Sequence, residues 1–182
     1  GSTTVNWTTS FRTPPDVLEH WTRVHGVKGF TEKDLVPHWE VVEQRLNIGE
    51  IPLDEINENN RSLYRGCAKL GYDVKPLRRN VKGCQKTGFC GLGCPLDAKQ
   101  GMLVTYLPDA VALGTVVLSR CSIQRVSIEG GAVTSLSGRL LSADGITPTG
   151  ATVVIKPKHV VLAGGAINTP ALLMRSGFTH GG

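Results

Sequence analysis

The chain has 182 residues, of which 40% are hydrophobic and 19% are charged, and its formal net charge is +5 at pH 7. These values are typical of an ordinary globular domain and exclude a collagen-like or a disordered chain. No run of about 18 apolar residues occurs, so we expect no transmembrane segment. The basic residues that gather between Lys69 and Lys86 follow no recognition motif, so we expect no nucleic-acid partner.

The sequence has no recognisable start. It begins at Gly1, its first methionine is Met102, and no charged and apolar leader opens it. We therefore expect an excerpt of a larger protein, from which the cellular compartment, cytoplasmic, periplasmic or membrane-associated, cannot be inferred.

The first half of the chain predicts helices. Residues 1–12 alternate polar and apolar side chains, which predicts an extended strand or an ordered loop. Thr13 is followed by two prolines, which predicts an N-cap and a helix that ends at Gly26. Further helices are expected over residues 31–45 and 55–70, each with an apolar stripe.

Two tryptophans and one more helix complete this half. Trp21 and Trp39 fall on apolar stripes, so we expect them in the core rather than against a ligand. A helix is also expected over residues 98–106, followed by a short turn that Gly114 ends.

The second half of the chain predicts strands. Gly130-Gly131 and the stretch 144–150 predict turns, and the last two runs before residue 156 are expected to form a hairpin. The β-branched runs are residues 115–118, 123–128, 132–141 and 151–155.

A strand, a glycine turn and a helix follow. Residues 158–163 form a largely apolar strand pattern that runs directly into Gly164-Gly165 and a helix beginning near Thr169. Glycines let the backbone approach a ligand, and a helix N-terminus offers free N–H groups to anionic or polar oxygens. Tight strand-to-helix packing in any α/β domain explains the pattern equally well.

Three of the five cysteines lie in one loop, residues 84–95. Cys84, Cys90 and Cys94 are separated by five and three residues, and the glycines between the last two let sulfurs and N–H groups converge. The loop is consistent with an iron–sulfur or other metal site, with inert packing, or with a disulfide. Zinc is disfavoured because no fourth cysteine or histidine lies close by in the sequence.

Three stretches together resemble the glucose–methanol–choline family of flavoprotein oxidoreductases. Residues 163–177, Ala-Gly-Gly-Ala-Ile-Asn-Thr-Pro-Ala-Leu-Leu-Met-Arg-Ser-Gly, resemble the second signature of that family. Residues 1–7, Gly-Ser-Thr-Thr-Val-Asn-Trp, are similar to its flavin-contacting segment. The cysteine loop with residues 97–100, Asp-Ala-Lys-Gln, is similar to a bacterial branch. Their order and spacing agree, so the resemblance covers essentially the whole chain.

The resemblance implies an α/β (α+β) fold that is incomplete in this chain. It comprises part of a FAD-binding Rossmann-like domain with helical and antiparallel-sheet segments of a substrate domain. Residues 1–12 are the flavin-contacting segment, and residues 13–113 are the helical part, with the cysteine loop at 84–95. Residues 114–182 are the strands and glycine-rich turn of the FAD domain. The catalytic histidine region of the family is expected outside this chain, so no catalytic residue is assigned.

The resemblance also assigns residue roles on the flavin side. Gly1, Ser2 and Asn6 are expected to contact the isoalloxazine or the pyrophosphate, and Trp7 is expected to line the substrate side of the flavin. Without the resemblance, Asn6 would be interpreted as a turn residue that caps its own loop.

Further cofactor contacts are implied near the end of the chain. Ile123 opens a strand and matches the position whose backbone contacts the adenine edge. Gly164 and Gly165 are expected near the ribose and the pyrophosphate of FAD.

The cysteine spacing matches that of a three-iron cluster in membrane-linked sugar dehydrogenases of the family, where the cluster carries electrons away from FAD. Cys84, Cys90 and Cys94 are therefore candidate iron–sulfur ligands, with inert packing as the alternative. A cluster would also imply an electron-acceptor protein, such as a cytochrome, as a partner.

The reaction implied is oxidation of a CH–OH group in a small alcohol or sugar, in which the carbon passes a hydride to flavin N5. We expect the excerpt to be inactive alone. The alternative from another class is a non-enzymatic metal-binding or electron-relay module built on the cysteine loop, which predicts bound metal without flavin.

Overall fold

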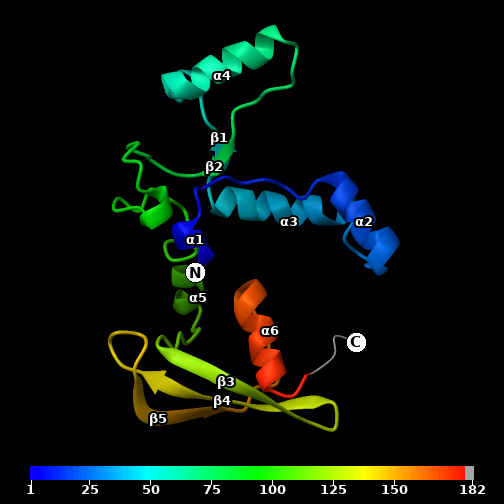
Figure 1. The fold of residues 1–182 in the computed structure, drawn as a ribbon, viewed down its shortest axis with the longest axis vertical. Helices are drawn as coiled ribbons and strands as arrows, with labels where there is room; N and C mark the ends of the chain where they lie inside the picture. Colours follow the sequence, from blue (N-terminus) through cyan, green and yellow to red (C-terminus); the bar gives the residue numbers. More distant parts are fainter. Residues whose placement is uncertain (179–182) are drawn as a thin grey trace. The chain divides into compact units, whose positions relative to one another are not determined.

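The computed structural model describes residues 1–178, which form helices and antiparallel strands. The mixed α/β class expected from the sequence is therefore confirmed. The chain divides into two compact units between Thr115 and Val116 (Figure 1). Residues 179–182, which the expected segment 114–182 includes, lie outside the described residues. Among residues 1–178, no helix has the length and apolar character needed to cross a membrane.

The first unit is mainly helical. A small antiparallel sheet joins distant parts of it, because β1 (Ile48–Glu50) pairs with β2 (Arg78–Asn80) in a register that sets Ile48 opposite Asn80. An isolated bridge then joins Thr9 to Arg79. The elements of this unit in chain order are α1 (Ser2–Val5), α2 (Pro15–His25), α3 (Glu32–Arg45), β1 (Ile48–Glu50), the 3-10 turn η1 (Leu53–Glu55), α4 (Glu58–Lys69), β2 (Arg78–Asn80), the 3-10 turn η2 (Cys90–Leu92) and α5 (Tyr106–Ala112).

The start of α2 differs from the sequence prediction. Pro14 occupies the N-cap position and no side chain caps the helix, so the predicted N-cap at Thr13 is wrong. Proline suits the first helical position, taken here by Pro15, because its fixed φ is helical and its missing N–H is not needed there. The predicted end is confirmed, since Gly26 has a left-handed φ of 65°.

A capping box fixes the start of α3. The Thr31 hydroxyl accepts a hydrogen bond from the Asp34 N–H at 3.3 Å, and the Asp34 carboxylate accepts one from the Thr31 N–H at 3.0 Å. The two bonds satisfy donors that would otherwise have no partner at a helix N-terminus. The predicted helix from residue 31 to about Arg45 is confirmed.

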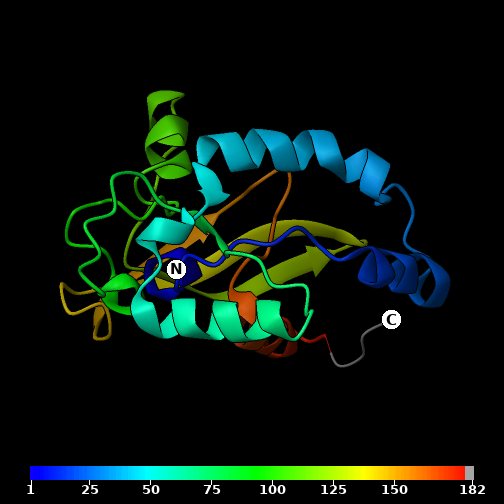
Figure 2. The same cartoon turned by 90° about the horizontal axis from the view of Figure 1, so that it is seen from above.

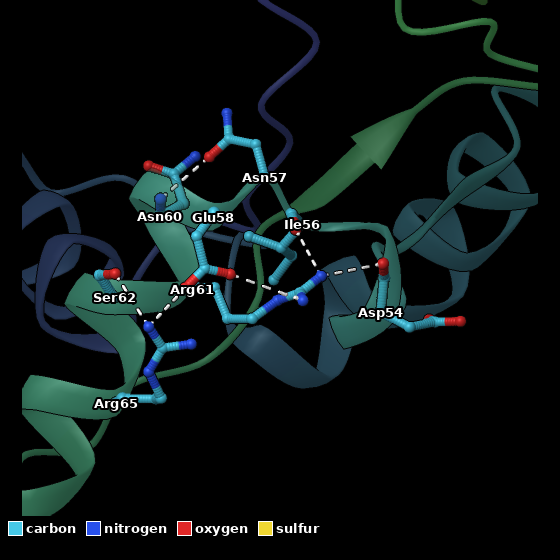
Figure 3. A network of polar contacts seen from close by, with 8 residues as sticks. All are labelled: Asp54, Ile56, Asn57, Glu58, Asn60, Arg61, Ser62 and Arg65. Carbon is cyan, nitrogen blue, oxygen red and sulfur yellow. Dashed lines mark hydrogen bonds and ion pairs between the residues drawn. The ribbon is translucent and has the colours of Figure 1, made fainter.

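The helix α4 begins three residues later than expected because a polar network precedes it (Figure 3). The Asn57 side chain accepts a hydrogen bond from the Asn60 N–H at 2.9 Å and caps the helix. Arg61 then donates to the carbonyl oxygens of Ile56 at 2.8 Å and Asp54 at 3.1 Å. The network therefore ties η1 to the first turns of α4.

The core of the first unit is small and partly polar. Its buried apolar residues include Leu18 and Leu46, but Trp21 is 38% exposed and Trp39 is half-buried. The expected core position of Trp21 is therefore wrong. Trp39 instead packs against the guanidinium of Arg12, which lies 5.5 Å from the ring centroid. Buried polar side chains supply much of the remaining interior, and these are Thr8, Asn80, Lys99 and Thr105.

The second unit is a three-stranded antiparallel sheet with one helix (Figure 2). The strands β3 (Cys121–Glu129), β4 (Ala132–Leu141) and β5 (Pro148–Ile155) neighbour one another in chain order, and α6 (Gly165–Arg175) packs against β3. The turn at Gly130-Gly131 and the hairpin between β4 and β5 confirm the prediction.

Two predicted strands do not form. Residues 115–118 and 158–163 have no strand structure, and Val161 is 89% exposed. A strand must exchange hydrogen bonds with a neighbouring strand. Among the described residues, no strand pairs with either run.

One predicted helix is also wrong. Residues 98–106 do not form a helix, because Lys99 makes a β-bridge with Val81 and α5 starts only at Tyr106. Helical periodicity was present in this stretch, but contacts with residues far away in the sequence determine its backbone.

Candidate cofactor site

The amino-terminal segment, residues 1–12, begins as the helical turn α1 and then runs extended. The prediction of an extended strand or ordered loop is therefore correct only beyond α1. The helix packs against η2 in the cysteine loop. Ser2 and Asn6 are exposed, and 66% of Trp7 is accessible to solvent. The residues expected to contact the flavin thus lie on an exposed side of the segment.

Lys99 is buried against this segment although it carries a charge, since only 6% of it is exposed. Its ammonium group donates hydrogen bonds to three backbone carbonyl oxygens, those of Thr4, of Asn6 at 3.0 Å and of Cys90 at 2.6 Å. We call these four groups the Lys99 cluster. Because an ammonium group has three N–H donors, the cluster gives each of them an acceptor and offsets the cost of burying the charge.

Arg79 makes a second connection between the same two segments. Its Nε donates to the hydroxyl of Thr8 at 2.6 Å, and its Nη2 donates to the sulfur of Cys90 at 3.3 Å. Thr8 is fully buried with a φ of 68°, a region that β-branched residues rarely adopt. The Asn80 N–H also donates to the Thr8 carbonyl at 3.2 Å. Long-range hydrogen bonds therefore hold this unfavourable backbone conformation.

Two glycines permit close approach of the backbone to the segment. A Cβ placed on Gly101 would lie 2.9 Å from the carbonyl oxygen of Thr3. A Cβ on Gly91 would lie 2.8 Å from the ring of Trp7. The Thr3 hydroxyl additionally accepts a hydrogen bond from the Met102 N–H at 3.2 Å. Residues 3–7 are thus packed between the cysteine loop and residues 99–102.

The exposed side of the segment offers hydrogen-bond donors. The Asn6 side-chain oxygen accepts from the Thr8 N–H at 3.4 Å, which leaves the amide NH₂ without an acceptor among residues 1–178. The Ser2 hydroxyl makes no hydrogen bond with the described residues either. FAD carries carbonyl and phosphate oxygens that need donors, so the chemistry of this donor set fits the cofactor.

The other expected cofactor residues lie in the second unit. Ile123 is half-buried on β3 opposite Gly138, next to an irregularity in the strand register. The Gly164 N–H donates to the Thr169 hydroxyl at 2.9 Å, and α6 begins at Gly165. Gly165 has a φ of 86° with no atom within 4 Å of a Cβ position, so its backbone is open to a ligand.

The structure of residues 1–178 gives no support for a metal site at the three cysteines of the loop. Cys84, Cys90 and Cys94 are free and half-buried. Residues 1–178 contain no group of three or more His, Cys, Asp or Glu side chains that could hold a metal ion. The predicted three-iron cluster is therefore unsupported, and so are the electron-acceptor partner inferred from it and the relay-module alternative.

Cys94 nevertheless has a distinct environment. Hydrogen bonds from the backbone N–H groups of Leu96 and then Lys99 lower the pKa of its thiol below the ordinary value. This effect belongs to a single thiol and requires no cluster.

Surface cavities coincide only partly with the predicted residues. A cavity of about 310 Å³ in the second unit includes Ser176 and Gly177, from the signature stretch 163–177, together with residues 125–128 of β3. A larger cavity of about 440 Å³ in the first unit includes none of the predicted site residues.

Sequence reasoning missed Lys99 and Arg79. Lys99 lies in the stretch 97–100, which carried part of the family resemblance, and this was the one sequence signal that could have pointed to Lys99. Its burial was not expected, because lysine is almost never fully buried unless its charge is paired or hydrogen-bonded.

Comparison with known proteins decides the family. The model of the GMC oxidoreductase family matches residues 1–181. The chain belongs to the GMC oxidoreductase family. The family expected from the three sequence stretches is therefore confirmed, and it is a family of FAD-dependent enzymes.

Several members of the GMC family are similar to this chain over nearly its whole length. An uncharacterized GMC-type oxidoreductase of Mycobacterium tuberculosis is 33% identical over 178 residues, which cover 97% of this chain and 27% of that protein. A long-chain-alcohol oxidase of Arabidopsis thaliana is 31% identical over 186 residues, 99% of this chain and 25% of that enzyme. An oxygen-dependent choline dehydrogenase of Yersinia pseudotuberculosis is 25% identical over 190 residues, 97% of this chain and 33% of that enzyme. The chain thus spans about a quarter to a third of the length of these relatives.

Proposed function

We propose that this GMC chain is the part of a FAD-dependent oxidoreductase that holds one portion of the cofactor site, in a protein that oxidises the CH–OH group of an alcohol. The family match over residues 1–181 is the observation that carries the proposal. The names of the relatives, a long-chain-alcohol oxidase and a choline dehydrogenase, favour an alcohol as the substrate.

The exposed donors of the amino-terminal segment provide the flavin-side contacts. Ser2 and the amide NH₂ of Asn6 have no acceptor among the described residues and donate to oxygens of the cofactor. Gly1 contributes backbone without a side chain at the same end. Trp7, which is 66% exposed, presents an apolar surface that helps to position the carbon chain of the alcohol and to exclude water from it.

The second unit provides the nucleotide-side contacts. The backbone of Ile123 on β3 contacts the adenine, and the open backbone at Gly164 and Gly165 approaches the ribose and pyrophosphate. The α6 N-terminus begins at this turn, so its unpaired N–H groups favour the negative charge of the phosphates.

When bound, FAD supplies the redox chemistry by accepting a hydride from the alcohol carbon. The residues of this chain bind and orient, because no described side chain is assigned as the base that removes the hydroxyl proton. We propose that the base comes from another part of the intact protein, and that the isolated excerpt is inactive.

The intact protein tests this proposal directly. After purification, its visible spectrum should show an oxidised flavin, and acid should release FAD rather than FMN. Anaerobic addition of dodecanol, choline or glucose should bleach the flavin with at least one alcohol. Turnover with oxygen or with an artificial electron acceptor then distinguishes an oxidase from a dehydrogenase. A purified protein without flavin, which neither binds FAD nor shows alcohol-dependent reduction, would contradict the proposal.

A matched variant links the activity to this chain. Asn6→Asp keeps the shape of the side chain but replaces its NH₂ donor by a second oxygen. We expect weaker FAD binding, by about tenfold for one hydrogen bond lost to a charged or polar acceptor. Asn59→Asp, at an exposed position of α4, is the control that should leave FAD affinity unchanged.

A further inference from the structure

Lys99 touches neither the cofactor nor the substrate in the proposed function, yet it is a buried cation that contacts the amino-terminal segment. Its ammonium group reaches two carbonyls of that segment, of Thr4 and Asn6, and one carbonyl of the cysteine loop, of Cys90. Thr4 and Asn6 lie 95 and 93 positions before Lys99 in the sequence, and Cys90 lies nine positions before it. The Lys99 side chain therefore bridges two segments that no continuous secondary structure joins.

Backbone geometry extends the effect to the exposed side of the segment. In a trans peptide the carbonyl of one residue and the N–H of the next point in opposite directions. Because the Asn6 carbonyl points to Lys99 at 3.0 Å, the N–H of Trp7 points away from Lys99. The hydrogen bond from the ammonium group thus stabilises this orientation of the peptide between Asn6 and Trp7.

The burial of Lys99 argues for a specific role beyond stability. Only 6% of the residue is exposed, and an apolar side chain of similar length would avoid the cost of burying a charge. An apolar side chain would nevertheless leave the carbonyls of Thr4, Asn6 and Cys90 without this donor. Lysine is therefore required where three carbonyl oxygens have to converge on one point.

We propose that Lys99 is a positioning residue that holds residues 4–7 in the conformation in which the segment contacts the cofactor. This inference rests on the proposed function for the identity of the cofactor. Lys99 acts through Thr4, Asn6 and Cys90 and does not itself touch the flavin. Cys90 contributes to this role through its backbone carbonyl oxygen, which accepts a hydrogen bond from Lys99, and not through a metal-bound sulfur.

The test compares Lys99→Met and Lys99→Arg with the wild type in the intact holoenzyme. Methionine retains the length and removes the donors. Arginine retains the charge, but its larger planar head cannot occupy the convergence point of three carbonyls without displacing them. Leu18→Ala is the matched control, because Leu18 is a buried core residue of α2 that belongs to neither segment.

Amide hydrogen exchange provides a readout that does not depend on activity. Amide hydrogens exchange when the local structure opens, and loss of the Lys99 hydrogen bonds should make this opening more frequent. Exchange of the amides of residues 4–8 and 91–92 should therefore be at least about tenfold faster in Lys99→Met and about threefold faster in Lys99→Arg. The visible circular dichroism of the bound flavin should change in both variants, and the dissociation constant for FAD should rise by about tenfold or more in Lys99→Met. Leu18→Ala should lower the melting temperature but leave these three quantities at wild-type values.

The outcomes separate this inference from the proposed function. Wild-type exchange rates and flavin dichroism in Lys99→Met would overturn the positioning role, even in a protein that binds FAD. Equal changes in Leu18→Ala would overturn it as well, because they would show a general loss of stability. If Lys99→Met does not fold, wild-type values in Lys99→Arg overturn it. If the wild-type protein binds no FAD but Lys99→Met still has faster amide exchange at residues 4–8, the proposed function is rejected. The role of Lys99 in holding the segment is then retained.

Discussion

Gly91 lies directly against the indole ring of Trp7, so that a Cβ on Gly91 would come within 2.8 Å of ring atom Cζ2. Gly91 is part of η2, and Trp7 follows α1, so the contact joins the cysteine loop to the amino-terminal segment. The absence of a side chain at residue 91 is thus required for the observed position of the tryptophan.

Gly91→Ala should displace the Trp7 ring. Because 66% of Trp7 is exposed, the ring can move, and we expect a loss of stability of only about 1 kcal/mol. Tryptophan fluorescence should change at the same time, with Trp7→Phe as the background in which that change disappears. Gly66→Ala in α4 is the control: nothing lies within 4 Å of its Cβ position, so it should stabilise by about 0.5–1 kcal/mol. Unchanged fluorescence in Gly91→Ala would refute the contact.

An ion cluster around Glu43 should make stability depend on acid pH. Arg12 donates two hydrogen bonds of 2.8 Å to the Glu43 carboxylate, and Arg78 donates one of 2.5 Å. The hydrogen bonds from Arg12 and then Arg78 lower the pKa of Glu43 from 4.5 to about 2. Since the folded-state pKa is below the unfolded one, the stabilisation is complete above about pH 4.5 and is lost as the pH falls towards 2.

Glu43→Gln removes this pH dependence. At neutral pH the variant should be less stable by about 1–2 kcal/mol, after allowance for solvent screening of the partly exposed arginines. Its stability, measured by chemical denaturation at a series of pH values, should then fall less than that of the wild type between pH 5 and pH 2. Glu19→Gln, at an exposed position of α2, should follow the wild-type curve. Parallel curves for Glu43→Gln and the wild type would contradict the assignment.

The cap of α4 allows a local test of the network in Figure 3. Asn57→Ala removes the side-chain oxygen that accepts the Asn60 N–H at 2.9 Å. We expect α4 to lose about 1 kcal/mol, measured as faster amide exchange in its first turn. Asn59→Ala makes the same chemical change at a position without a cap bond. Because alanine favours a helix more than asparagine does, amide exchange in the first turn of α4 should be as slow as in the wild type or slower. Equal effects of the two substitutions would show that the cap contributes nothing.

Cys94 should be alkylated at a lower pH than an ordinary thiol. Hydrogen bonds from the N–H groups of Leu96 and Lys99 lower its pKa below 9.0, which increases the reactive thiolate fraction near neutral pH. The rate of iodoacetamide labelling of the Cys94 peptide, followed by mass spectrometry over a pH series, should rise at lower pH in the folded protein than in the denatured protein. Cys94→Ser identifies the labelled peptide. Coincident pH profiles in the folded and denatured states would exclude the effect.

The elements that sequence predicts correctly are those whose cause is local. The helix from Thr31 to Arg45 has a capping box at its start and an apolar stripe, and both signals lie within the helix itself. The turn at Gly130-Gly131 likewise follows from two residues with φ of 58° and 81°. Such patterns need no knowledge of distant contacts, which is why these predictions are confirmed.

The failures have long-range causes. Residues 98–106 have a helical sequence pattern, but the Lys99 side chain donates hydrogen bonds to residues 4, 6 and 90. The Lys99 backbone also forms a β-bridge with Val81, which is incompatible with a helix there. Residues 158–163 carry a strand pattern without a neighbouring strand among the described residues. For the site, the family resemblance predicts that Ser2 and Asn6 contact the flavin, and this stays a prediction. Lys99 lies in the stretch 97–100 that carried part of the resemblance, but no local pattern predicted that it is buried.

The hydrogen bonds of residues 1–8 have a consequence for how the protein is made. The hydrogen-bond partner of Thr4, Lys99, is synthesised 95 residues later, and the partner of Thr3, Met102, is synthesised 99 residues later. At a synthesis rate of about 5–20 residues per second, Thr3 and Thr4 spend roughly 5–20 s without these partners. Residues 3 and 4 therefore reach their final conformation only after residues 99–102 have been made, and until then their backbone groups stay available to chaperones.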